Sequence, residues 1–296
     1  MAAFVMAGPL QAIAFVVLFA LIGLFLPFIG LLSNAALGLV TLRLGSGRGM
    51  QIAAAAALGI GVLILLIQQQ AIAALGSTLL QWAAVIALAV MLQQTASWSR
   101  VLTTVLGISA IFIMIFHISV ADTGEFWKEI IRPMTEMPVV KEQFPGIDLE
   151  KAVDAAAEFM TGVLVALLSL AIIISLMIAR HWQAMLYNPG GFRDEFRELR
   201  ISKPVGLAMI VLITLGLFTN IPLIIDIIVA GMTVFLFQGL ALIHGTHHRL
   251  KLHTGWLIGF YIVLLLMPVQ LGILLAAFGI IDSVANFRSY LADKAP

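Results

Sequence analysis

Long apolar runs are the feature that most constrains how this chain can fold. Runs of nearly 20 residues recur along its whole length, and each is long enough to cross a hydrocarbon layer about 30 Å thick. Only 10% of the 296 residues are charged, whereas a soluble globular domain carries roughly 25%. Backbone groups in lipid must hydrogen-bond within their own segment, which favours helices. The sequence therefore predicts an all-α polytopic membrane protein, a transmembrane helical bundle with residues 1–296 in one domain.

The apolar stretches predict eight to ten helices. The first stretch is interrupted near Pro27 and the last near Pro268. Because proline removes a backbone donor and breaks or kinks a helix, each stretch is either one kinked span or a hairpin. Two kinked spans give eight helices and two hairpins give ten. The other spans are expected at about 51–67, 71–92, 101–120, 159–179, 204–219 and 221–243, with a turn at 68–70.

The lysines and arginines predict how the chain is oriented. In the hairpin arrangement, loops on one side hold 12 of the 16 bases, and residues 122–158 on the other side hold nine acids and the remaining four bases. Kinked spans would move Arg43, Arg48 and Arg100 outside, so the charge pattern favours hairpins or re-entrant pairs. The positive-inside rule then makes both termini cytoplasmic and makes 122–158 an acidic external insert. Phe126, Trp127 and Ile130 recur in it at helical spacing, which predicts a helix lying on the membrane interface. Asp148 is the expected N-cap of the helix that follows.

Asp226 is the acid that lies inside an apolar run, and it is the first candidate for ligand binding. A charge at the bilayer centre costs about 2.5–3.5 kcal/mol on insertion scales, so Asp226 should face a bundle interior or a cavity. The alternative is a shallow acid, hydrated or bonded to a neighbouring helix. Asn34 and Asn220 are further candidates, although interhelical hydrogen bonding is the usual role of such residues.

No cofactor and no metal site are predicted. The chain has no cysteine, which excludes disulfides and thiol chemistry. His244, His247 and His248 would share one helix face, where a metal cluster is geometrically feasible, but no acid lies nearby. Nucleotide-binding and hydrolase motifs are absent from the sequence, and no nucleophile–base pair is evident. The expectation is a protein that is not an enzyme and does not bind nucleic acid.

The segment 180–203 is expected to be a cytoplasmic amphipathic elbow. Its Asn-Pro-Gly-Gly sequence ends one helix, and apolar residues at i, i+4 and i+7 then predict a short interfacial helix. The start of that helix is a candidate site for an anion, and internal ion pairs such as Asp194–Arg197 are the alternative. The residues expected to contact a partner or a lipid are Asn188, Pro189, Gly190, Gly191, Phe192, Arg193, Phe196 and Arg197.

Three stretches resemble a known family. They are "YNPGGFRDEFRELR" in the elbow, "FQGLALIHG" at 237–245 and "GIIDSVANFRSY" at 279–290. They are similar to the YybS-like family of bacterial polytopic membrane proteins, a domain of unknown function. The resemblance adds Gln238, Gly239 and His244 as family motif residues, with no assigned chemical role. It also implies a distant grouping with the substrate-binding subunits of energy-coupling-factor transporters.

These observations favour a non-enzymatic, small-molecule-binding and transporter-like component of the bacterial inner membrane. Asp226 and Asn34 would line a cavity that opens to the acidic external side. The alternative is a membrane scaffold or assembly protein that binds lipids and protein partners without a substrate. Expected partners are membrane lipids, a protein on the cytoplasmic side and further copies of the chain in a homo-oligomer.

Overall fold

All regular elements in the described residues are helices. The computed structural model describes residues 1–67, 71–143 and 146–287, and no strand occurs in them. The predicted all-α fold is therefore confirmed. The turn predicted at 68–70 and the last residues of the third family-like stretch, 288–290, lie outside the described residues.

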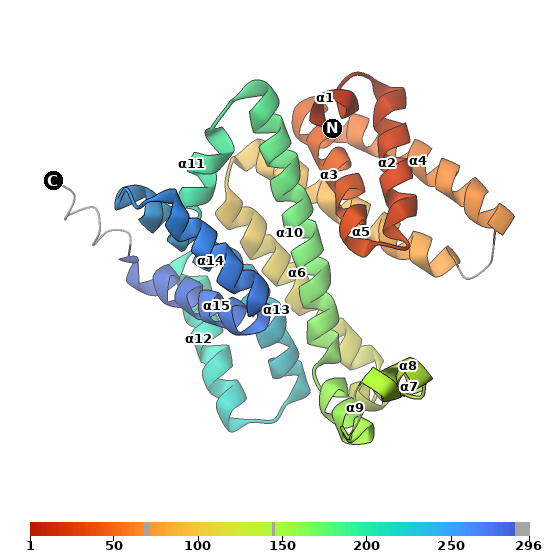
Figure 1. The fold of residues 1–296 in the computed structure, drawn as a ribbon, viewed down its shortest axis with the longest axis vertical. Helices are drawn as coiled ribbons and strands as arrows, with labels where there is room; N and C mark the ends of the chain where they lie inside the picture. Colours follow the sequence, from red (N-terminus) through yellow and green to blue (C-terminus); the bar gives the residue numbers. More distant parts are fainter. Residues whose placement is uncertain (68–70, 144–145, 288–296) are drawn as a thin grey trace. The chain divides into compact units, whose positions relative to one another are not determined.

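Ten of the helices correspond one to one with the ten apolar spans of the hairpin prediction (Figure 1). They are α2 (Pro9–Gly23), α3 (Pro27–Leu44), α4 (Ser46–Ile67), α5 (Ala71–Thr95), α6 (Trp98–Ser119), α10 (Met160–Tyr187), α12 (Lys203–Phe218), α13 (Pro222–Arg249), α14 (Thr254–Leu266) and α15 (Pro268–Ala285). The remaining helices are shorter and more polar or lie at the N-terminus: α1 (Ala2–Val5), α7 (Thr123–Thr135), α8 (Pro138–Gln143), α9 (Leu149–Ala157) and α11 (Gly191–Glu198).

Within the described residues, six helices are long and apolar enough to cross a membrane. These are α3, most of α5 (Gly76–Thr95), α6, α10, α13 and α15. The pair α11 and α12 qualifies only as one span bent by 53°, which would raise the number to seven. The helices α2 and α14 are apolar but shorter, so the predicted eight to ten helices include members that do not reach the length of a full span.

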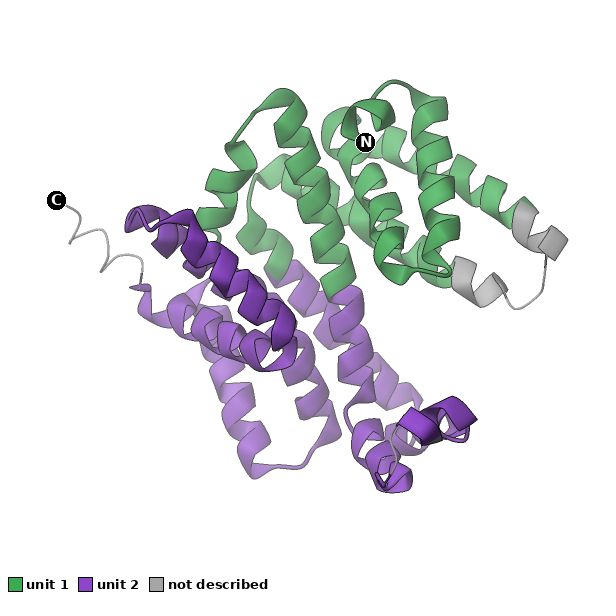
Figure 2. Ribbon diagram, in the orientation of Figure 1, with its two compact units in different colours: residues 1–102, 170–199 green, residues 103–169, 200–296 purple. Residues whose placement is uncertain are grey.

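The chain divides into two compact units (Figure 2). Unit 1 comprises residues 1–102 and 170–199, and unit 2 comprises residues 103–169 and 200–296. The divisions fall inside α6 and α10, so each of these long helices contributes residues to both units.

In unit 1, the first apolar stretch is a hairpin. Proline at the start of α3 fits the first turn of a helix, where its missing N–H costs no hydrogen bond. The helices α2 and α3 approach so closely near the turn that a Cβ atom on Gly23 would lie 2.7 Å from the Cα of Gly30. At the other end of the hairpin, Pro9 and Ala12 line the same pocket as Val40. The two helices therefore run antiparallel, and the kinked-span alternative is excluded.

In unit 2, two glycines allow α13 and α15 to cross at backbone contact. A Cβ atom on Gly239 would lie 2.1 Å from the carbonyl oxygen of Leu275, and one on Gly279 would lie 2.2 Å from that of Phe235. Small residues at crossings are the usual means of close helix packing in membranes. The last apolar stretch also breaks, at Met267, so α14 and α15 are separate helices.

The acidic insert contains α7, α8 and α9. Asp122 caps α7 by accepting a hydrogen bond from the N–H of Glu125, with an Oδ1–N distance of 2.9 Å. Asp148 caps α9 in the same way through the N–H of Lys151, at 3.2 Å. The predicted cap at Asp148 is thus confirmed. The indole N–H of Trp127 donates to Thr161 Oγ1 at 2.8 Å, which ties α7 to the start of α10.

We expect α9 to lose stability in acid through Asp148. Hydrogen bonds from the side chain and the backbone N–H of Lys151 hold the pKa of the Asp148 carboxyl below its ordinary value of 3.8. A lowered pKa in the folded state means that the contribution is present above pH 3.8 and is lost as the pH falls through the folded pKa. Amide hydrogen exchange across residues 149–157, corrected for intrinsic rates, should show falling protection below that pH. Asp148→Asn keeps a capping oxygen and should lack this pH dependence; equal dependence in the variant would contradict the assignment.

Candidate functional site

A buried carboxylate on α13 contacts a histidine on α6. Asp226 lies one turn after Pro222 and is only 1% exposed. Its Oδ2 lies 2.7 Å from Nε2 of His117, and its Oδ1 accepts a hydrogen bond from the N–H of Gly162, also at 2.7 Å. Both carboxylate oxygens are therefore engaged, as expected for a buried acid. Asp226 thus belongs to a defined polar contact inside unit 2.

The start of α10 supplies part of this contact. Gly162 lies in the first turn of α10, where backbone N–H groups have no partner within the helix and the helix dipole favours a negative charge. A Cβ atom on Gly162 would lie 2.6 Å from the Cα of Asp226. Only glycine permits this approach, because any side chain would push α10 away from α13. Glycine at position 162 therefore allows a backbone N–H at the start of α10 to reach the carboxylate of Asp226.

A polar pocket with a volume of about 590 Å³ adjoins His117. The acids Asp122, Glu125 and Glu158 line it, together with the base Lys128. Lys128 forms an ion pair with Asp154 at 3.0 Å, and the hydrogen bond that Lys128 donates to Asp154 raises the pKa of Lys128 above its ordinary value. The pocket therefore contains three acids and one base, and that base, Lys128, is already paired with Asp154 outside the lining. The arrangement suits a small polar or cationic solute.

The three ligand-binding candidates from the sequence differ in their distance from this pocket. Asn220 lines it, and Asp226 reaches its wall through His117. Asn34 belongs to unit 1, where its Nδ2 donates to Gln81 Oε1 on α5 at 3.1 Å. That contact is the interhelical hydrogen bond expected as the alternative for Asn34. Sequence reasoning missed His117, although a lone histidine in the apolar run "IFIMIFHIS" is itself a signal.

Glu195 holds the short helix α11 of the elbow against α6 and α10. Its carboxylate accepts two hydrogen bonds from Arg180, with an Oε2–Nε distance of 2.9 Å in one of them, and the indole N–H of Trp98 lies 3.3 Å from Oε2. A bidentate arginine–carboxylate pair fixes orientation as well as distance. The helix α11 that carries Glu195 follows the break predicted at 188–191. Gly190 has φ +93°, a left-handed conformation that suits glycine.

Some of the other predicted elbow residues contact neighbouring side chains, and those at the tip are exposed. The ring of Phe192 packs against Trp98 and Phe196, with centroid distances of 6.1 and 6.0 Å. Arg197 forms the predicted ion pair with Asp194 at 3.5 Å. The side chain of Asn188 lies against Gly191, where a Cβ atom would be 2.3 Å from Nδ2. The exposed residues at the tip are Asn188, Pro189, Gly190 and Arg193.

The family motif residue Gln238 lies in a buried hydrogen-bond network of unit 2. Its Oε1 accepts from the N–H of Ile201 at 2.9 Å, and its Nε2 donates to Asp282 Oδ2 at 3.0 Å. Asp282 is fully buried in α15. The interpretation of Asp226 as the acid within an apolar run was therefore incomplete, because Asp282 directly follows the last apolar run and is buried as well. Gly239 permits the helix contact that brings this network together.

The histidines at the end of α13 and at the start of α14 contact other groups of the protein. His244 and His247 lie in the last turns of α13, and His253 is the N-cap of α14. His244 Nε2 lies 2.7 Å from the hydroxyl of Tyr261, and His253 Nδ1 accepts from the N–H of Gly255 at 3.0 Å. His247 Nε2 lies 3.4 Å from the carbonyl oxygen of His253. Across the described residues, no group of three or more histidine, aspartate or glutamate side chains is arranged to hold a metal ion.

Comparison with known proteins yields one family match. The model of a family described as "Predicted membrane protein (DUF2232)" matches residues 13–283, which is most of the chain. No curated protein matches the chain. No solved structure matches it either.

Proposed function

Because the chain belongs to the family of predicted membrane proteins designated DUF2232, we propose that it is a non-enzymatic, small-molecule-binding and transporter-like component of the bacterial inner membrane. The observation that carries this proposal is the buried contact between His117 and Asp226 at the wall of a polar pocket of about 590 Å³. That volume lies within the roughly 300–1,000 Å³ of small-molecule sites. In the orientation that the charges predict, the pocket opens outside and both termini are cytoplasmic.

The chemistry of the pocket supports a small cationic solute. Asp226 engages Nε2 of His117 and so fixes the imidazole at the pocket wall. Asp122, Glu125 and Glu158 surround the same space. Ionisable groups within a membrane segment are costly and are retained where a solute or proton pathway uses them. In this proposal the acids attract the cation and His117 orients it by a directed hydrogen bond.

The resemblance to the YybS-like family supplies an analogy that favours this proposal. YybS-like proteins are grouped with substrate-binding subunits of energy-coupling-factor transporters, which capture small molecules outside the cell. Function does not follow from fold alone, so this agreement is an analogy. The rival proposal is a membrane scaffold. It is favoured by the elbow, where Glu195 fixes α11 while the tip residues Asn188, Pro189 and Arg193 remain exposed.

We expect small organic cations to stabilise the purified protein against heat. A ligand that binds only the folded state raises stability in proportion to the logarithm of its concentration over Kd. The probes are ammonium-bearing solutes, neutral polyols and carboxylates of matched size. Only the cations should raise Tm, and His117→Ala should abolish the rise, while Asp226→Asn should weaken the apparent affinity by about tenfold, equivalent to 1.4 kcal/mol.

The control for this experiment is Asp148→Asn, which also converts a carboxylate of the insert to an amide. Asp148 does not line the pocket, so this variant should keep the response of the unmodified chain. Stabilisation by none of the three solute classes would contradict the proposal. If a protein partner were then recovered through the elbow, the scaffold would become the better explanation.

A further inference from the structure

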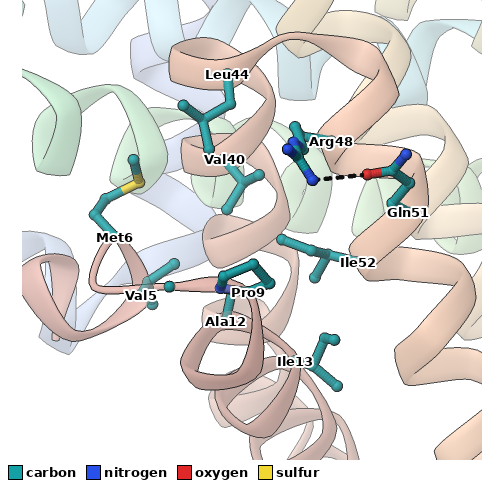
Figure 3. Close-up of a pocket in the computed structure, with 11 residues that line it drawn as sticks. Val5, Met6, Pro9, Ala12, Ile13, Val40, Leu44, Arg48, Gln51 and Ile52 are labelled. Carbon is teal, nitrogen blue, oxygen red and sulfur yellow. Dashed lines mark hydrogen bonds between the residues drawn. The ribbon is translucent and has the colours of Figure 1, made fainter.

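A second pocket lies in unit 1, at the end of the α2–α3 hairpin where α4 begins (Figure 3). Its volume is about 340 Å³. Val5, Pro9, Ala12, Val40 and Ile52 contribute apolar walls from four helices of the unit. Figure 3 shows Arg48 and Gln51 together on α4 at one side of these walls, with a dashed line between them. The pocket therefore combines an apolar interior with one cationic group.

Arg48 has no acidic neighbour along the first part of the chain. Residues 1–121 contain no aspartate or glutamate, and the ion pairs found among the described residues do not include Arg48. Its guanidinium Nη1 donates to Gln51 Oε1 at 3.2 Å, and a guanidinium carries further N–H groups that can donate to a ligand. The same bond leaves the amide Nε2 of Gln51 as a second donor beside it. Arg48 thus lacks a counter-ion from its own segment of the chain.

The surroundings of the pocket are those of a lipid boundary. Leu44 lines the pocket and is largely exposed, as are the nearby residues Phe4, Leu10 and Met50. Exposed apolar side chains of this kind are stable against acyl chains and not against water. An inorganic anion would leave the apolar walls without a partner. A neutral apolar molecule would in turn leave the guanidinium without a counter-charge.

We propose that this pocket is a binding site for an anionic phospholipid of the surrounding membrane. Its phosphate would accept hydrogen bonds from the guanidinium of Arg48 and the amide of Gln51. The first part of one acyl chain would lie between the walls formed by α2, α3 and α4. Basic pockets between membrane helices on the cytoplasmic side bind lipid headgroups in this way, and arginine suits phosphate through its planar fork of donors. The site is independent of the solute pocket in unit 2.

The test uses the full chain in nanodiscs that contain equal amounts of phosphatidylglycerol and phosphatidylcholine. After release into detergent, native mass spectrometry should detect one phosphatidylglycerol retained per chain. Arg48→Gln should lower its retention by about tenfold, equivalent to 1.4 kcal/mol of binding free energy. Met6→Trp, which fills the pocket from its rim, should lower retention of the lipid while Arg48 is intact. Tm of each variant shows whether it is folded.

The matched control is Arg43→Gln. Arg43 lies in the last turn of α3, just before the start of α4, but its guanidinium stacks on the ring of Tyr187, at 4.1 Å from the centroid, and it does not line the pocket. Retention should therefore be unchanged in this variant. Three results would overturn the proposal: equal losses in Arg43→Gln and Arg48→Gln, equal retention of both lipids, or displacement of the lipid by millimolar inorganic phosphate. The first indicates general surface charge, the second an apolar groove only, and the third a free-anion site.

Discussion

Gly239→Ala should destabilise unit 2 by about 3 kcal/mol, at the upper end of the usual cost of overpacking. The new methyl group would lie 2.1 Å from the carbonyl oxygen of Leu275 and 2.7 Å from its carbonyl carbon. Backbone atoms have no rotamers with which to move aside, so α13 and α15 would have to separate. Separation would in turn stretch the hydrogen bond between Gln238 and Asp282, which is 3.0 Å long. Gly279→Ala should act in the same way through Phe235.

The control for these variants is Gly107→Ala in α6. Apart from its chain neighbours and the backbone of its own helix, a Cβ atom on Gly107 would meet nothing within 4 Å, so the substitution should be neutral or stabilising by up to about 1 kcal/mol through helix propensity. Unfolding in mixed detergent micelles, followed by circular dichroism as sodium dodecyl sulfate is added, measures all three variants. If Gly239→Ala unfolded at the same detergent fraction as Gly107→Ala, the close crossing of α13 and α15 would be wrong.

The glycine crossing gives the family motif a structural meaning. "FQG" places Gln238 and Gly239 on consecutive positions of α13, where one bonds to Asp282 and the other admits the backbone of α15. The same glutamine accepts a hydrogen bond from the N–H of Ile201, in the last part of the elbow. Two of the stretches that carry the resemblance therefore meet in one buried contact. These motif residues stabilise the contact between α13 and α15. The sequence alone therefore indicated no catalytic or binding role for them.

The helices could be predicted because their signals are local. Apolar run length, proline at the first position of a helix and the Asp148 cap each act within one or two turns, and all are readable in the sequence. The choice between a kinked span and a hairpin near Pro27 has no such local signal, and in the sequence only the distribution of bases over the loops favours the hairpin. It depends on the contact of Gly23 with Gly30 across the turn, and a proline is compatible with either arrangement.

The candidate site could be predicted only in part. Asp226 was identifiable because a charge in an apolar run is costly wherever it lies. Its partners were not, because His117 and Gly162 are 109 and 64 residues away and only the packing of α6, α10 and α13 brings them together. Asp282 was missed for a different reason. It follows the apolar run directly, and nothing in its neighbours along the chain indicates that Gln238 buries and binds it.

Asp226→Ala should lower the free energy of unfolding by about 3 kcal/mol. Removal of the carboxylate leaves the N–H of Gly162 and the ring nitrogen of His117 without their partner, and breaking one side of a buried pair typically costs about 3–5 kcal/mol. The side chain of His117 is 15% exposed, so water can reach part of it and the lower end of that range applies. Asp226→Asn should cost less, near 1 kcal/mol, because its oxygen still accepts from Gly162.

A double-mutant cycle with His117→Ala separates the direct contact from general disturbance of the fold. If the two side chains interact, the double variant should be more stable than the sum of the single effects predicts, with a coupling of about 1–2 kcal/mol. The control is Asp154→Ala. Asp154 is an exposed acid of the same unit that pairs with Lys128, so its removal should change the free energy of unfolding little. Strict additivity of His117→Ala and Asp226→Ala would mean that the 2.7 Å contact carries no energy of its own. In that case Asp226 would stabilise the fold through Gly162 alone, and His117 would have no fixed position from which to orient a solute.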